Sequence, residues 1–276
     1  MYETAQALEI PLWAGSAMPV AWRRPNWDYP LDQPLDEALA VGFHMLERYG
    51  FHALEILQSH AERRRGGETG VRSVQCLSGA AVWSTSDVRW SRQLADRALE
   101  TIEDGPGRLD PDKVEDPHVI LIEYCDGFNG TVLMLGDNGY VNRFAYAGKS
   151  EVSIDALEYY TDTGPSIALF SYLGLNVEDF FLTGRAPTPI ERTYLTTGVL
   201  AATMISRASG GERVETPHLE IAYLPASGPC RRPSRERPTG ACLDPWPMPE
   251  PGATSAAEIN PVTRDGTIRG VPADGR

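Results

Sequence analysis

The 276-residue sequence has little positive charge and no long apolar run. It has 25 Lys and Arg residues against 38 Asp and Glu residues, for a formal net charge of -13. This balance argues against a phosphate-backbone partner, because such binding rests on clustered cations. No apolar run approaches the roughly 20 residues that span a bilayer, and the first residues lack the basic and apolar regions of a secretory signal. We therefore expect a cytoplasmic protein that binds neither nucleic acid nor membrane.

Two further patterns are missing. The four cysteines, Cys76, Cys125, Cys230 and Cys242, include no C-x-x-C pair and no metal-ligand spacing, so we expect unpaired thiols. No complete nucleotide-binding fingerprint follows a strand: "GPGRLD" at 105–110 has two of the three glycines and comes after an acidic helical stretch. The sequence therefore predicts no cofactor site of its own.

Turn residues and apolar periodicity divide the chain into expected helices and strands. The most regular stretch is a helix over about 45–65, which Gly66 and Gly67 end. Other helices are expected up to Leu8 and in 87–107, 167–182 and 189–208. Strands are expected at 10–14, 71–77, 118–124, 131–135, 140–147, 152–160 and 212–224. The turns "DGFNG" and "GDNGY" are typical of hairpins, so the strands that flank them should be antiparallel neighbours.

The grouping of these elements predicts an α+β fold, with an open-faced, mostly antiparallel sheet covered by helices on one face. The Pro-rich segment 19–34 is expected to be an extended connector. After Leu224 the chain is dense in Pro, Gly and small polar residues, which predicts a disordered tail over 226–276. The first residues read as the end of an αβ unit. Because the first helix has no capping residue, we expect that a preceding part has been cut away.

On a helical wheel with 100° per residue, one narrow sector of the helix at 45–65 contains His52, Glu55, Ser59 and Glu62. A carboxylate one turn after His52 could orient the imidazole or raise its pKa, as in a general acid or base. An ordinary solvated helix face is the alternative. His60 falls on the apolar side, so we expect a hydrogen-bonded histidine in the core.

Gly50 is unusual because glycine inside a helix costs about 1 kcal/mol relative to alanine. A missing side chain one turn from an ionisable group would let a ligand or a second backbone approach closely. The alternative is tight helix packing against a bulky side chain such as Trp83 or Trp90.

Two other clusters are possible ligand sites. A metal ion could take its nitrogen and oxygen ligands from His44, Glu47, His52 and Glu55. Their spacing matches no known zinc signature, so we expect no metal. The cluster Trp22, Arg23 and Arg24 could bind an anionic or sugar-like substrate, but a Pro-rich surface connector would also explain it.

Several long blocks resemble a known family. They are "IPLWAGSAMPVAWRRP", "YGFHALEILQSHAERRRGGETGVRSVQCLSGAAVW", "FFLTGRAPTPIERTYLTTGVLAATMISR" and "GGERVETPHLEIAYLP". Together they resemble the C-terminal part of Gfo/Idh/MocA-type oxidoreductases, and more closely a poorly characterised bacterial branch, from about residue 3 to residue 225. Members pair an N-terminal Rossmann domain, which binds NAD or NADP, with a C-terminal open-faced sheet that supplies substrate contacts and oligomer interfaces.

The resemblance implies three regions. Residues 1–18 would be a remnant of the end of the Rossmann domain, 19–225 the C-terminal α+β domain, and 226–276 the disordered tail. The Gly-rich loop and the lysine of the usual Glu-Lys-Pro motif would then precede Met1. NAD or NADP is therefore the implied cofactor, but this chain alone is not expected to bind it.

The family often carries an Asp-x-Gly-x-His-x-x-Asp pattern at the start of its first long C-terminal helix. Here Gly50 and His52 match, Glu55 replaces the second acid, and Arg48 stands at the first acid position, with Glu47 one residue earlier. The resemblance implies that His52 transfers a proton, that Glu55 orients it, and that Gly50 lies near the nicotinamide.

The remaining site residues implied are substrate contacts: Arg23, Glu47 and Tyr49. The function expected is therefore the substrate-binding and oligomerisation domain of an NAD(P)-dependent oxidoreductase of sugar-like or polyol substrates, inactive alone, and homo-oligomeric through the open sheet face. A non-catalytic assembly or binding module is the alternative. A broken or misassigned reading frame is a third interpretation, which the loss of pattern after Leu224 suggests.

Overall fold

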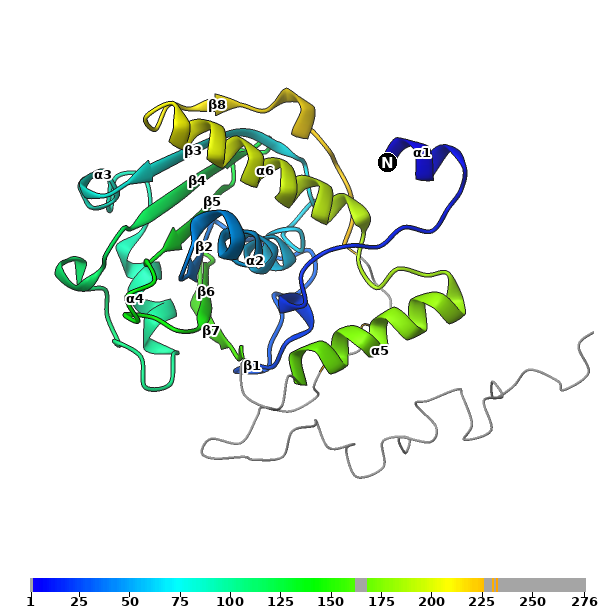
Figure 1. Cartoon of the computed structure of the whole chain (residues 1–276), viewed down its shortest axis with the longest axis horizontal. Coiled ribbons are helices and arrows are strands. Elements are labelled where there is room, and N and C mark those ends of the chain that lie inside the picture. Colours follow the sequence, from blue (N-terminus) through cyan, green and yellow to red (C-terminus); the bar gives the residue numbers. More distant parts are fainter. Residues whose placement is uncertain (1, 162–167, 226–229, 231, 233–276) are drawn as a thin grey trace, which may run out of the picture.

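The computed structural model describes residues 2–161, 168–225, 230 and 232 (Figure 1). Its helices are α1 (Tyr2–Ala7), α2 (Leu46–Ala61), α3 (Ala80–Ser84), α4 (Arg92–Glu100), α5 (Ala168–Thr183) and α6 (Ile190–Ala208), with short 3-10 turns η1 (Met18–Val20), η2 (Pro111–Lys113) and η3 (Pro217–Leu219). The strands are β1 (Arg23–Arg24), β2 (Glu37–Gly42), β3 (Val71–Ser78), β4 (His118–Tyr124), β5 (Asn129–Met134), β6 (Phe144–Lys149), β7 (Ile154–Tyr159) and β8 (Val214–Glu215). Apart from Cys230 and Arg232, the predicted tail at 226–276 lies outside the described residues.

All of these strands belong to a single sheet, in the order β1-β7-β6-β2-β5-β4-β3-β8. Among the named strands, β2 and β5 run parallel and every other neighbouring pair is antiparallel. Helices pack on the sheet, as Figure 1 shows. The predicted α+β class, with a mostly antiparallel sheet and covering helices, is therefore confirmed.

One of the two predicted hairpins is wrong. The turn "DGFNG" joins β4 to β5, which pair antiparallel as predicted. The turn "GDNGY" does not join neighbours, because β2 lies between β5 and β6. No strand was expected at 37–42, since "EALAVG" lacks apolar and polar alternation. In the structure, five of the six residues of β2 are buried, as a central strand covered on both faces requires.

Helices lie on both faces of the sheet, rather than on one. Ala38 and Ala40 of β2 belong to the core under α2 and α6, whereas Leu39 and Val41 belong to the core under α4. The strongly amphipathic α4 covers β2, β6 and β7. The outer strands β3, β4 and β8 extend beyond α4, so the second face is only partly covered (Figure 1).

Other sequence predictions are close to the observed elements. The helices predicted at 167–182 and 189–208 become α5 and α6, and the strands predicted at 71–77 and 118–124 become β3 and β4. The strand predicted at 10–14 is absent, because this segment crosses the surface without pairing to the sheet. Its Trp13 ring instead donates a hydrogen bond to Thr188 Oγ1 at 2.9 Å.

The last predicted strand, at 212–224, is reduced to the two residues of β8, with η3 shortly after it.

Cys76, Cys125 and Cys230 are unpaired thiols, while Cys242 lies outside the described residues. Within residues 2–161 and 168–225, no helix is both long and apolar enough to cross a bilayer.

Candidate functional site

The candidate site lies where the segment before η1 crosses α2 (Figure 1). α2 forms because its apolar residues repeat on the side that faces the sheet and α6, where Leu54 and Leu57 are buried. Glu47 and Arg48, in the first turn, are exposed. His52 is half-buried between these two environments.

Ser16 is the hydrogen-bond partner of His52. Its Oγ lies 2.7 Å from His52 Nδ1, and it also accepts the N–H of Met18 at 3.0 Å. Since a hydroxyl can both donate and accept, Ser16 can hold the imidazole in either tautomer. The other ring nitrogen, Nε2, has no hydrogen-bond partner among the described residues. It is therefore the atom that can exchange a proton with a ligand.

Burial lowers the pKa of His52, and the positive charge of Arg48 adds to this effect. The shift places the pKa below the usual value of about 6.5. His52 is thus a neutral imidazole at pH 7, which is the form able to accept a proton.

Glu55 is buried one turn farther along α2, where its carboxylate faces α6. Thr196 Oγ1 donates to Glu55 Oε1 at 2.6 Å, and the backbone N–H of Ser16 lies 3.5 Å from Oε2. Burial raises the pKa of this carboxyl group, while Arg192 acts in the opposite direction. The carboxylate therefore reaches His52 only through Ser16. A direct Glu55–His52 contact, which the helix spacing suggested, is not among the contacts of the described residues.

Aromatic rings gather beside His52 at the first turns of α2. Tyr49 lies at the centre, with its ring centroid 5.3 Å from Phe43, 4.6 Å from His44 and 6.0 Å from His52. Phe144 of β6 closes the group at 4.9 Å from Phe43. The structure thus brings the predicted residues His52 and Tyr49 together, and it leaves Glu47 exposed nearby.

Gly50 is buried where α2 packs against α6. A methyl group on Gly50 would lie 3.5 Å from Leu46 Cδ1 and 3.7 Å from Leu200 Cδ1, which are ordinary van der Waals distances. Neither Trp83 nor Trp90 is the packing partner, because both belong to the core on the opposite face of the sheet. Packing against α6 therefore leaves room for a methyl group and does not require glycine at this position, and the predicted place of Gly50 beside a cofactor stays a prediction.

Replacing Gly50 with alanine is expected to raise the free energy of unfolding by about 0.5–1 kcal/mol, because the methyl group fits and glycine weakens a helix interior. Gly198→Ala in α6 is the matched control. Its added methyl would overlap the side chain of Leu219, so that variant should be less stable than the unaltered chain. Urea unfolding of both variants measures the difference, and a destabilised Gly50→Ala variant would contradict this packing account.

Arg23 is placed away from His52. Its side chain is 2% exposed and forms an ion pair with Asp28 at 2.5 Å. It also donates to the carbonyl of Pro19 and lies over the Tyr159 ring at 4.9 Å. Arg23 therefore does not belong to the group around His52, and its predicted contact with the same substrate gains no support from the geometry.

His60 is a core histidine, as predicted. Its Nδ1 accepts the backbone N–H of Tyr29 at 3.3 Å, its Nε2 lies 2.8 Å from the Tyr159 hydroxyl, and its ring stacks on Tyr146. In the described part of the chain, no three side chains of His, Cys, Asp or Glu are placed to hold a metal ion.

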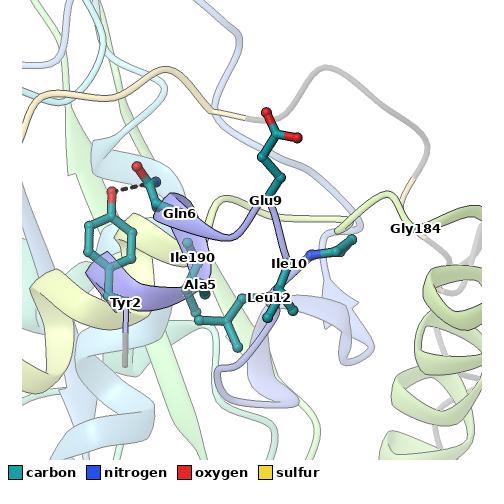
Figure 2. Close-up of a pocket in the computed structure, with 9 residues that line it drawn as sticks. Tyr2, Ala5, Gln6, Glu9, Ile10, Leu12, Gly184 and Ile190 are labelled. Carbon is teal, nitrogen blue, oxygen red and sulfur yellow. Dashed lines mark hydrogen bonds between the residues drawn. The ribbon is translucent and has the colours of Figure 1, made fainter.

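The described residues do not fit a complete dinucleotide site. β2 runs into α2 through Phe43–Met45, a turn without glycine, and Met45 provides no side-chain cap at the helix start. Binding of a pyrophosphate at such a turn needs glycines that let the backbone approach it. A cavity of about 330 Å³, shown in Figure 2, lies at α1 and the start of α6. Glu9 in its lining adds a negative charge, which disfavours a pyrophosphate there.

Comparison with solved structures finds partial similarity to NAD-bound dehydrogenases. GenD2 from gentamicin A biosynthesis, in complex with NAD, is 16% identical with a TM-score of 0.42, over 66% of this chain and 55% of that one. The myo-inositol dehydrogenase of Lactobacillus casei, with NAD(H) and myo-inositol, is 13% identical with a TM-score of 0.42, over 66% and 54%. The WlbA dehydrogenase of Bordetella pertussis, with NADH and UDP-GlcNAcA, is 13% identical with a TM-score of 0.37, over 67% and 57%.

This chain therefore spans little more than half the length of those proteins. No family model matches it, and no curated protein is similar to it in sequence. Similarity of this extent does not assign an activity to the chain.

Proposed function

We propose that this chain is the substrate-binding part of an NAD(P)-dependent oxidoreductase, and that it binds a sugar-like or polyol ligand beside His52. The observation that carries the proposal is the Ser16–His52 pair, with a neutral imidazole whose Nε2 is free of protein partners among the described residues. The sequence pattern around Gly50 and His52, which resembles that of such oxidoreductases, agrees with it.

The proton is the part of the reaction that these residues can handle. Oxidation of an alcohol to a carbonyl releases the hydroxyl proton, and a positioned imidazole can take it. His52 accepts that proton at Nε2, while Ser16 steadies Nδ1. Glu55 holds the backbone of Ser16 and is therefore a positioning residue. The nicotinamide, which accepts the hydride when bound, requires a dinucleotide-binding unit that the described residues do not contain.

The rings near His52 suit a sugar-like ligand better than a highly charged one. Tyr49 and His44 are half-buried, so part of each ring is open to a ligand. Ring faces offer apolar contact area, while the Tyr49 hydroxyl and the two histidines offer hydrogen bonds. Ligand sites of this kind combine mostly apolar walls with a few placed polar groups.

Replacing His52 with glutamine should weaken binding of a polyol such as myo-inositol by up to about tenfold, the loss of one hydrogen bond. Ligand-observed NMR on the full chain measures the affinity without any need for the cofactor. His218→Gln is the matched control, because His218 is exposed on η3 and belongs to no part of this site. Equal affinities in the two variants would remove His52 from the binding site.

A second candidate, a non-catalytic assembly module, is supported by α5. This helix exposes Phe170, Phe181 and Leu182, and its contacts to the body include the edge-to-face pairs Trp13–Phe180 and Trp22–Tyr172. Such exposed apolar side chains suit a protein contact.

The part of the second sheet face that α4 leaves open is polar, with ion pairs such as Arg213–Glu123 at 2.8 Å. Homo-oligomerisation through that face stays a prediction, and a chain that self-associates but binds no polyol would favour this candidate.

A further inference from the structure

A cavity of about 260 Å³ lies between the C-terminal half of α2, the connector that follows η1, and the link from α5 to α6. Six charged residues line it: Arg23, Asp28, Glu62, Arg63, Arg192 and Arg232. The cavity is separate from the ring cluster at the first turns of α2, because none of the rings around His52 lines it.

The lining carries more positive charge than its carboxylates can balance. Both carboxylates are already shared with arginines. Asp28 pairs with Arg23 at 2.5 Å and also contacts Arg232. Glu62 accepts two hydrogen bonds from Arg192, at 2.9 and 2.5 Å. Four guanidinium groups therefore face two carboxylates, which leaves two positive charges in a chain whose formal net charge is -13.

Arg63 provides the free donors of this cavity. Its Nε donates to the carbonyl of Tyr29, but its two terminal nitrogens have no hydrogen-bond or ion-pair partner among the described residues. Arg23, although its side chain is 2% exposed, also has a buried Nε without a partner. Buried donors are almost always satisfied in proteins, so the unpaired Nε of Arg23 indicates a missing acceptor. Arg63 is half-buried, and its terminal nitrogens are open to a ligand in the cavity.

Neutral polar groups complete the lining. Ser59 and Thr188 contribute hydroxyl groups, and Cys230 contributes a thiol. Burial raises the pKa of Cys230, so the thiol is uncharged at pH 7 and does not offset the arginines. Burial also lowers the pKa of Arg63; Asp28 and Glu62 act in the opposite direction, and Arg232 and Arg192 act in the same one. An anion in the cavity would offset the two positive charges that the carboxylates leave unbalanced.

We propose that this cavity binds a small oxyanion, a phosphate or phosphate monoester, through Arg63 and the buried Nε of Arg23. The planar guanidinium fork matches the oxygens of a phosphate and can donate two parallel hydrogen bonds. The volume is just below the roughly 300–1,000 Å³ of pockets that take drug-sized ligands, so the ligand is compact. This inference does not depend on the function proposed for His52.

The test is titration of the full chain with inorganic phosphate by calorimetry, at constant ionic strength maintained with chloride. A second titration with a sugar phosphate distinguishes a free ion from a monoester: the tighter of the two is the ligand class. Arg63→Gln should weaken binding at least tenfold, about the value of one charge-assisted contact. Arg65→Gln removes the same charge two residues away, from an exposed side chain outside the cavity, and should change the affinity by less than about twofold.

Three results would overturn the proposal: no saturable binding to the unaltered chain, unchanged affinity in Arg63→Gln, or an equal loss in Arg65→Gln, which would mean diffuse charge attraction. Thermal unfolding shows whether Arg63→Gln is folded. If it is not, Arg63→Lys keeps the charge but loses the fork, and it should still bind several-fold more weakly than the unaltered chain. Full affinity in Arg63→Lys would then overturn the bidentate contact.

Discussion

Replacing Arg192 with methionine is expected to lower the free energy of unfolding by about 3–5 kcal/mol. Arg192 and Glu62 form a bidentate pair between α6 and α2, and Glu62 is 1% exposed. Removing one partner leaves an uncompensated charge in the core, which costs far more than the lost contact itself. Chemical denaturation monitored by circular dichroism measures the change.

Two control variants make this prediction specific. Arg97→Met breaks an exposed ion pair to Glu100 in α4 and should cost less than about 1 kcal/mol. The double variant Arg192→Met with Glu62→Leu removes both charges and should be more stable than Arg192→Met alone, because replacing a buried pair with apolar side chains is often neutral. A double variant that is no better than the single one would show that the cost comes from lost packing.

The pair belongs to a chain of buried hydrogen bonds along α2. The Tyr223 hydroxyl donates to Glu62 at 2.9 Å, and Gln58 donates to Tyr223 at 3.0 Å and to Glu68 at 2.5 Å. Arg64 continues it with an ion pair to Glu68 at 3.0 Å. Satisfied networks of this kind specify one packing arrangement. Because α2 also carries His52, we expect a loss of this network to displace the imidazole.

Periodicity in the sequence predicted the elements that bury one side and are bounded by clear turn or stop residues. α2 was predicted because its apolar residues repeat at helical spacing before Gly66 and Gly67, and β3 and β4 because they are rich in β-branched and other apolar residues. β2 was missed because a strand covered on both faces shows no alternation. Missing β2 also made the predicted topology wrong. Because β2 lies between β5 and β6 in the sheet, the connection from β5 to β6 is a crossover and not a hairpin.

The candidate site shows a similar division. His52 was predicted because it lies at the polar edge of a recognisable helix, but Ser16, 36 residues earlier, carries no local signal for that contact. Arg23 was predicted from its cluster with Trp22 and Arg24 and from the family resemblance, neither of which could show that it pairs with Asp28, five residues later, away from His52. The unpaired nitrogens of Arg63 could not be predicted, because what matters is which acids lie nearby in space and which of these are already paired.

The second large effect is expected at Gly136, in the loop between β5 and β6. Gly136 has a φ of +69°, and an added Cβ would overlap the carbonyl oxygen of Glu115. Alanine there combines the cost of a left-handed backbone with a clash against another backbone segment, so Gly136→Ala should lose about 3–5 kcal/mol of unfolding free energy. The Gly136 carbonyl also accepts the N–H of His44 at 2.5 Å, so the ring cluster around Tyr49 should be displaced with it.

Gly139, in the same loop, separates the two contributions. Its φ is +81°, but an added Cβ would meet no atom within 4 Å. Gly139→Ala should therefore show only the left-handed backbone cost, about 1–2 kcal/mol. Near-ultraviolet circular dichroism, which reports the aromatic side chains, should change in Gly136→Ala and stay the same in Gly139→Ala. Equal losses of stability in the two variants would mean that Glu115 moves aside, and that this loop does not hold His44 in place beside Tyr49.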